Sequence, residues 1–288
     1  MLKIITVEGP SNTGKSTLLN QLETNFKKSG YLVYRLSVSR MDDGLVDDLV
    51  DLLQRQTDAY SIELDMKPIL DLKLAKEATV RLIDEYRKTL DHSILLKITE
   101  LKYAQLRAVM ASFEALDRAD CLGNIYLLID RSPLSTVLYG GLADTYLNFQ
   151  KSLFNTCVAK HGVIRTLSSI STYVNSFLTM TSPFIKDCYH KVIFLTSAKP
   201  YTIGATYSGK SDEVFDKESN SEHELFCHRY LDIASASSSN LDKLNMTHDF
   251  FHLRNDSDPE ITLHHALRIA DGEKIEKTTR TNYLVKRI

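Results

Sequence analysis

Short runs of apolar residues alternate with longer amphipathic stretches along this chain. Residues 4–7 and 31–38 are short, apolar and rich in β-branched or aromatic side chains, which is typical of strands. The same pattern recurs at 124–130, 191–195 and 250–253. Between these runs the apolar residues return at helical spacing. Strands that alternate with helices predict a three-layer α/β fold with a parallel central sheet.

The helical stretches differ in length and in how clearly they begin. Residues 17–26 form an amphipathic pattern directly after the first strand. The region 42–119 contains almost no glycine or proline, and its leucines follow helical spacing, so we expect a helical insertion there. Asp258 and Pro259 predict the start of a further helix over 259–270, with Asp258 as its N-cap.

A glycine motif lies between the first strand and its helix. Residues 9–16 read Gly-Pro-Ser-Asn-Thr-Gly-Lys-Ser, which fits the G-x-x-x-x-G-K-[ST] spacing. In this context the motif predicts a loop that binds the phosphates of ATP with Mg²⁺, because its backbone N–H groups can turn toward a polyphosphate. Lys15 would reach the β- and γ-phosphates, and Ser16 would hold Mg²⁺. The residues of this segment expected to bind the nucleotide are Gly9, Asn12, Thr13, Gly14, Lys15, Ser16 and Thr17.

A second polar element follows the strand at 124–130. Asp130 ends that strand at the carboxyl edge of the predicted sheet, where ligands of open α/β sheets bind. A carboxylate there can hold Mg²⁺ together with Ser16, and Arg131 beside it can bind phosphate through two N–H groups. The alternative is a surface Asp-Arg pair at the start of the next helix.

The composition narrows the class of protein without naming a substrate. With 288 residues, 43% of them hydrophobic, the chain is long enough for one large α/β domain. Its 35 basic and 37 acidic residues nearly balance, which argues against a protein that coats nucleic acid. The four cysteines show no C-x-x-C spacing, so neither a zinc site nor a redox pair is expected. Without a signal peptide or a long apolar stretch, we expect a cytoplasmic protein with no membrane partner.

The two motifs together resemble the thymidylate kinase group and its deoxynucleoside kinase relatives. The resemblance depends on Val-Glu-Gly at 7–9, which leads into the phosphate loop, and on Asp-Arg-Ser-x-x-Ser-x-x-x-Tyr-Gly-Gly at 130–141. Residues 103–107 are similar to the family's helix whose arginine contacts the acceptor nucleotide, and 212–231 to the segment that follows its lid. The resemblance implies a P-loop kinase fold with a lid over about 199–218. It also implies phosphoryl transfer from ATP to a nucleotide or nucleoside, with thymidylate as the leading acceptor.

The resemblance further implies roles for individual side chains. Glu8, Lys15, Asp130 and Arg131 are expected to take part in catalysis, and Lys210 on the lid is expected to close over the γ-phosphate. The substrate-binding side chains that it implies are Arg40, Tyr103, Arg107, Arg131, Ser135 and Tyr139. Tyr103 and Tyr139 could equally be packing residues. The chain departs from the family after its second strand, where Arg40 stands near the place of an Arg-Glu-Pro-Gly element that is missing.

Several alternatives stay open. If the acceptor is a hydroxyl, as for a deoxynucleoside kinase or a kinase of a modified base in DNA, Glu8 can act as the general base. If the acceptor is a monophosphate, Glu8 could instead organise the waters around Mg²⁺. A basic tail over about 272–288 could touch a DNA backbone, although such tails are usually solvated. A regulatory P-loop ATPase is the alternative from another class, with the 42–119 region as its partner surface.

We expect residues 1–288 to form a single kinase domain. By resemblance to relatives that pair through helices near the acceptor site, the 42–119 region could also form the interface of a homodimer.

Overall fold

The computed structural model describes the central sheet, the main helices that cover it and both ends of the loop between the first strand and the first helix. The described residues are 1–10, 13–37, 50–51, 54–55, 58, 67–89, 91–118, 123–131, 188–197, 227–228, 231–232, 235, 249–256, 258–272 and 285–287. The predicted lid over 199–218 lies outside them, as do residues 142–187 and most of the segment 212–231 that follows the lid.

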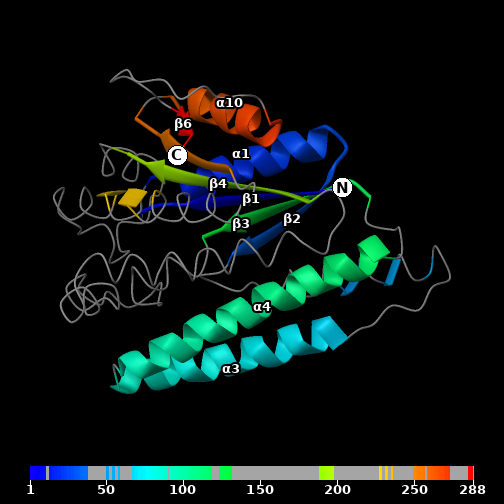
Figure 1. Ribbon diagram of the computed structural model, residues 1–288, viewed down its shortest axis with the longest axis vertical. Helices are drawn as coiled ribbons and strands as arrows, with labels where there is room; N and C mark the ends of the chain where they lie inside the picture. The colour runs from blue at the N-terminus through cyan, green and yellow to red at the C-terminus, as the bar shows by residue number, and fades with distance from the viewer. Residues whose placement is uncertain are drawn as a thin grey trace.

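Within the described residues, the sheet has six strands in the order β2-β3-β1-β4-β5-β6. Their bounds are β1 Leu2–Glu8, β2 Leu32–Ser37, β3 Ile125–Asp130, β4 Cys188–Thr196, β5 Asp249–Arg254 and β6 Val285–Arg287. The first five strands are parallel, and β6 pairs with β5 in the antiparallel direction. β1 therefore lies inside the sheet, and the carboxyl ends of five strands meet at one edge (Figure 1).

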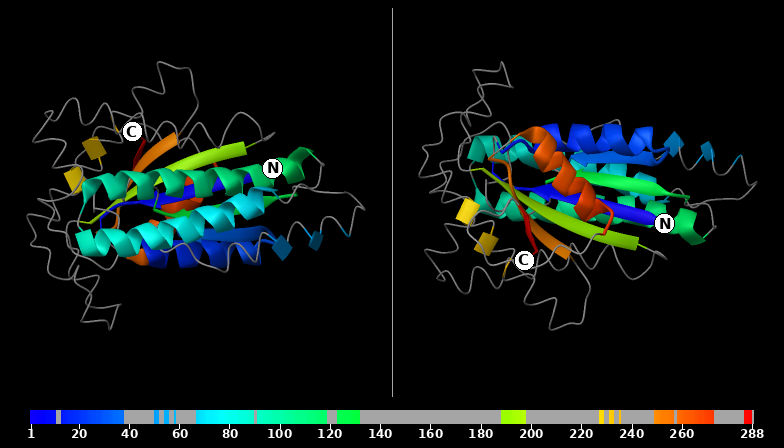
Figure 2. Two further views of the ribbon diagram at one scale, coloured as in Figure 1. Left: turned by 90° about the horizontal axis from the view of Figure 1, so that it is seen from below. Right: turned by 90° about the horizontal axis from the view of Figure 1, so that it is seen from above.

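Two pairs of helices cover the two faces of the sheet. α1 (Lys15–Lys28) and α10 (Pro259–Ala270) lie on one face, and α3 (Lys67–Thr89) and α4 (His92–Arg118) lie on the other. Figure 2 shows the α3–α4 pair from one side and the α1–α10 pair from the opposite side. The rings of Tyr34 in β2 and Phe113 in α4 lie 6.1 Å apart, which places α4 against the sheet. The predicted three-layer α/β architecture with a parallel sheet is therefore confirmed.

The core under α1 and α10 follows the alternation of the strands. Every second strand residue faces these helices, because successive side chains of a strand point to opposite faces. The buried apolar residues of this layer include Ile5, Val7, Leu18, Leu22, Tyr126, Leu128, Ile193, Leu195, Phe251, Leu253, Ala266 and Ile269. Since β1, β3, β4 and β5 all contribute, α1 is packed over the strands that carry the candidate site.

The strand and helix predictions agree with the structure where it describes the chain. The Asp258 side chain accepts a hydrogen bond from the backbone N–H of Glu260, and Pro259 is the first residue of α10, as predicted. Within the region 42–119, α3 and α4 are helical. β4 begins at Cys188, three residues earlier than the pattern indicates.

The sequence pattern did not predict β6. This strand has only three residues, from Val285 to Arg287, and two of them are basic. It pairs with the outer edge of β5. Val285 lies opposite Leu253, and Lys286 lies opposite His252. Within the part of the chain that the structure describes, no helix is long and apolar enough to cross a membrane.

Candidate phosphate-binding site

The glycine motif lies at the carboxyl end of β1, between β3 and β4. β1 ends at Glu8 and α1 begins at Lys15, so the loop joins a central strand to the N-terminus of a helix packed on it. In open α/β sheets, ligands bind at this edge, where neighbouring connections leave on opposite sides of the sheet. α1 follows β1 on one face, whereas α3 and α4, which follow β2, lie on the other.

Two glycines give the loop a backbone that other residues cannot adopt without strain. Gly9 has φ 145° and Gly14 has φ 87°. A Cβ at Gly9 would collide with the carbonyl oxygen of Leu195 in β4, and a Cβ at Gly14 would collide with the side-chain amide of Asn255. The loop therefore lies directly against the ends of β4 and β5.

The Lys15 side chain folds over the loop. It is 6% exposed, and its ammonium group donates hydrogen bonds to the carbonyl oxygen of Pro10 and, at 3.4 Å, to Oγ1 of Thr13. The Thr13 hydroxyl donates to the same carbonyl at 3.0 Å. The structure thus brings Lys15, Thr13 and both glycines together. Ser16 is exposed and Thr17 half-buried in the first turn of α1, while Asn12 lies outside the described residues.

Arg131 joins the end of β3 to the start of the loop. Its backbone N–H donates to the Val7 carbonyl at 3.0 Å, and its guanidinium donates to the Gly9 carbonyl at 3.1 Å. Its φ of 66° is unusual for a residue with a side chain and costs about 1 kcal/mol. The two motifs found in the sequence therefore meet, although 122 residues separate Gly9 from Arg131.

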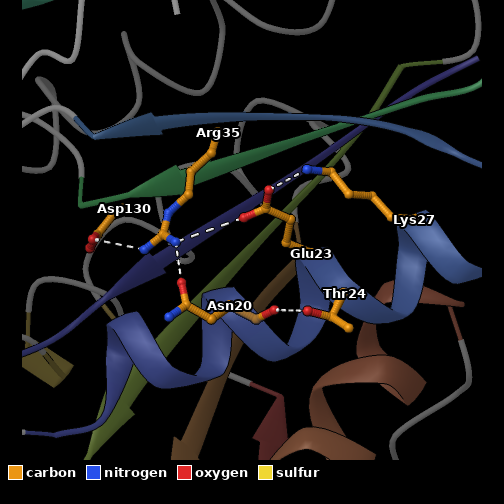
Figure 3. A network of polar contacts seen from close by, with 6 residues as sticks. All are labelled: Asn20, Glu23, Thr24, Lys27, Arg35 and Asp130. Carbon is orange, nitrogen blue, oxygen red and sulfur yellow. Dashed lines mark hydrogen bonds and ion pairs between the residues drawn. The ribbon is translucent and has the colours of Figure 1, made fainter. Parts of the chain in front are cut away.

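Asp130 is held by an arginine that the sequence analysis did not single out. The Arg35 guanidinium lies 3.7 Å from Oδ2 of Asp130 and 3.9 Å from Oε2 of Glu23, and it hydrogen-bonds to the side chain of Asn20 (Figure 3). Asn20 and Glu23 belong to α1, so Arg35 connects β2, β3 and α1. An arginine inside an otherwise apolar strand was the available signal, because a charge there requires a polar partner.

Glu8 and Lys102 lie on the other face of the sheet. Val7 packs in the core under α1, so Glu8, the next residue of β1, points toward the layer that holds α4. Glu8 is 1% exposed and Lys102 of α4 is 2% exposed. Burial and, less strongly, the positive charge of Arg131 lower the pKa of Lys102 to about 8. No sequence signal distinguishes Lys102 from the other lysines of the helical region.

The described part of the chain does not place the other predicted site residues beside the glycine loop. Arg107 is exposed on α4, and Tyr103 lies in the same helix with a side chain that is not described. Arg40, Ser135, Tyr139 and Lys210 lie outside the described residues. Their roles stay predictions.

The described residues fit a bound triphosphate. Gly9 and Gly14 let the loop lie tightly against β4 and Asn255, and Lys15 supplies a cation within the loop. For Mg²⁺, the chemistry of the Ser16 hydroxyl and the Asp130 carboxylate is suitable, because Mg²⁺ takes few protein oxygens and keeps several waters. Among the described residues, no group of three or more His, Cys, Asp or Glu side chains is placed to hold a metal.

The buried Lys102 leads to a pH-dependent prediction. An unfolded chain keeps the ordinary lysine pKa of 10.5, so between pH 8 and 10.5 it binds more protons than the folded protein. The stability of the wild type is therefore expected to rise over this range. Between pH 8 and 10.5 the stability of Lys102→Met relative to the wild type should fall by about 3 kcal/mol, because the variant has no lysine to titrate at this position.

Urea unfolding at several pH values measures this difference. Lys97→Met is the matched control, because Lys97 lies on the same helix with an exposed side chain. A stability difference for Lys102→Met that stays constant with pH would contradict the prediction.

Comparisons with known proteins give a distant structural similarity. No protein-family model and no curated protein matches the chain. The chain is similar to the structure of deoxyadenosine kinase from M. mycoides with bound dATP, at 15% identity and a TM-score of 0.43, over 93% of this chain and 99% of that chain. A second structure of that enzyme, with dCMP and a flexible dCDP bound, aligns at 14% identity and a TM-score of 0.36 over the same shares. Similarity at this level supports neither an activity nor a substrate, so we infer both from the residues of this chain.

Proposed function

We propose that this chain transfers the γ-phosphoryl group of ATP to a nucleotide or nucleoside. The observation that carries the proposal is the hydrogen bond from the Arg131 guanidinium to the Gly9 carbonyl. It joins the phosphate loop to the Asp-Arg element at the carboxyl edge of the sheet. Transfer of a phosphoryl group mainly requires alignment of the donor with the acceptor and neutralisation of their charge. The cations Lys15 and Arg131 and the carboxylate of Asp130 all lie at this edge of the sheet.

The proposed roles follow from position. Lys15 and the amides of the loop bind the donor phosphates, and Ser16 with Asp130 holds Mg²⁺, which neutralises charge on the phosphates when bound. Arg35 orients the Asp130 carboxylate from the side of α1. Arg131 binds the acceptor or the transferred group. Lys210, which belongs to the proposed lid, would exclude water and so suppress hydrolysis.

The acceptor follows from the resemblance of the motifs, which favours a thymidylate kinase-like nucleoside monophosphate kinase in the cytoplasm. The second candidate is a deoxynucleoside kinase, and the burial of Glu8 favours it. A carboxylate that is 1% exposed at the end of β1 and beside the phosphate loop is well placed to accept a proton from a hydroxyl.

A DNA-linked acceptor has less support. Lys286 and Arg287 of the basic tail belong to the edge strand β6, where they pair with His252 and Phe251 of β5. Two of its basic residues are therefore part of the sheet, whereas a tail that wraps DNA needs freedom to follow the backbone.

The test is a phosphoryl-transfer assay with the full chain. ATP labelled at the γ-phosphate is incubated with deoxynucleosides, their monophosphates or DNA that contains modified bases, with and without Mg²⁺. We expect label on one class of nucleotide or nucleoside only when Mg²⁺ is present. Steady ATP hydrolysis that no acceptor changes would favour a regulatory ATPase and refute the kinase.

Arg107 provides a test of the acceptor side. If it contacts the acceptor, Arg107→Ala should raise the acceptor KM about tenfold or more, because a hydrogen bond to a charged group is lost, and leave the ATP KM within about twofold. Steady-state kinetics with each substrate varied separately measures both constants. Lys97→Ala, an exposed cation on the same helix, is the control. Equal changes in the two KM values would remove Arg107 from the acceptor site.

A further inference from the structure

Asn255 lies directly behind the phosphate loop, far from it in sequence. It follows β5 and is 6% exposed. Its backbone N–H donates to the carbonyl oxygen of Thr196, the last residue of β4, at 2.8 Å. This bond continues the pairing of β4 with β5 and holds the Asn255 backbone at the carboxyl edge of the sheet.

Both ends of the Asn255 side chain are engaged. Its Nδ2 donates to the carbonyl oxygen of Thr13 in the loop at 2.9 Å, and its Oδ1 accepts from the hydroxyl of Thr262 in α10 at 2.8 Å. A hydroxyl that donates to Oδ1 selects one of the two amide orientations and turns Nδ2 toward the loop. Because both bonds are buried, loss of either partner leaves a polar atom without water to replace it.

The bond to Thr13 determines the direction of a loop N–H group. The peptide between Thr13 and Gly14 is trans, so its C=O and N–H groups point in opposite directions within one plane. With the carbonyl directed at Asn255, the N–H of Gly14 is directed away from α10 and β5. Gly14 also packs so closely on Nδ2 that a Cβ there would collide with it. Rotation of this peptide is therefore restricted from both sides.

We propose that Asn255 is a positioning residue for the donor triphosphate: through the Thr13–Gly14 peptide it holds the Gly14 N–H in the direction from which it can donate to phosphate. Thr262 acts one step further away, by setting the orientation of the Asn255 amide. This inference rests on the proposed phosphate site and adds two residues from the last strand-helix unit to it. A loop N–H that is aligned before the nucleotide arrives needs no reorganisation on binding.

The test compares nucleotide binding by neutral variants of nearly equal shape. Asn255→Leu removes the donor to Thr13 without adding charge, and Thr262→Val removes the hydroxyl that orients the amide. Thr262→Ser keeps that hydroxyl. ATP binding to each full-length protein is measured by calorimetric titration, and the midpoint of thermal unfolding is measured without nucleotide.

We expect the Kd for ATP to rise about tenfold for Asn255→Leu and severalfold for Thr262→Val, with affinity restored in Thr262→Ser. In turnover assays the ATP KM should rise while the acceptor KM stays within about twofold. A role confined to stability would instead lower the unfolding midpoint of all three variants and leave the Kd of the folded proteins unchanged, which would overturn the inference. If Asn255→Leu does not fold, equal affinities of Thr262→Val and Thr262→Ser would also overturn it. Wild-type protein that binds no ATP would refute the proposed function as well, so the two failures are distinguishable.

Discussion

Lys15→Ala is expected to abolish ATP-dependent phosphoryl transfer while the protein stays folded. The Lys15 ammonium is the cation that the loop itself supplies, and it lies over the Pro10 carbonyl and the Thr13 hydroxyl. In the proposed mechanism this charge faces the developing charge of the transferred group, so its removal should cost about a thousandfold or more in turnover. The fold should persist, because Lys15 is not part of the apolar cluster that holds α1 on the sheet.

The assay for this prediction is initial-rate transfer of labelled phosphate, with the folded state followed by circular dichroism. Lys27→Ala is the matched control on the same helix. Its ammonium pairs with Glu23 at 2.6 Å at an exposed position, where such pairs contribute well under about 1 kcal/mol. Activity of Lys15→Ala within about tenfold of the wild type would show that the loop does not bind the reacting phosphates.

Gly9→Ala is expected to disrupt the loop and destabilise the whole sheet. Gly9 has φ 145°, and an added Cβ would collide with the carbonyl oxygen of Leu195, which belongs to the backbone of β4. A flexible side chain could move aside, but the backbone of a central strand cannot do so without breaking its pairing with β1 and β5. We expect a loss of about 3 kcal/mol or more in the free energy of unfolding, and no detectable ATP binding.

Gly30→Ala is the matched control, because it measures the cost of backbone strain without a steric collision. Gly30 has φ 82°, so alanine there is strained as well, but a Cβ would meet no atom within 4 Å. Its expected cost is about 1 kcal/mol. Urea unfolding of both variants gives the comparison. If Gly9→Ala costs no more than Gly30→Ala, the close contact between the loop and β4 is not what requires glycine at position 9.

Local patterns in the sequence were sufficient for the elements around the site. The β1 strand, the glycine motif and α1 are contiguous in the chain, and each is recognisable from spacing and residue type alone. The same holds for β3 with Asp130 at its end, and for the Asp258 cap of α10. In each case the signal lies within about ten residues of the feature, which is the reach of strand alternation, helical spacing and capping.

Three interactions at the site could not be inferred from local sequence patterns. Arg35 meets Asp130, Asn255 meets Thr13, and Lys102 lies near Arg131, although none of these pairs is close in sequence. Each depends on which strands are neighbours. β3 lies between β1 and β2, so a strand that comes third in the chain separates the first two. Nothing in the local pattern of either strand encodes that order.

The reactive groups of the candidate site can be read from the chain alone: a glycine loop with a lysine, and far along the chain an acid and an arginine at a strand end. The side chains that hold these groups in place, Arg35 for Asp130 and Asn255 for the Thr13 carbonyl, become visible only in the folded molecule. The difference arises from the distance over which each signal acts. Side-chain spacing reports on neighbours within one element, whereas the partners of a buried polar group are set by the packing of whole strands and helices, which depends on the total apolar surface that they bury together.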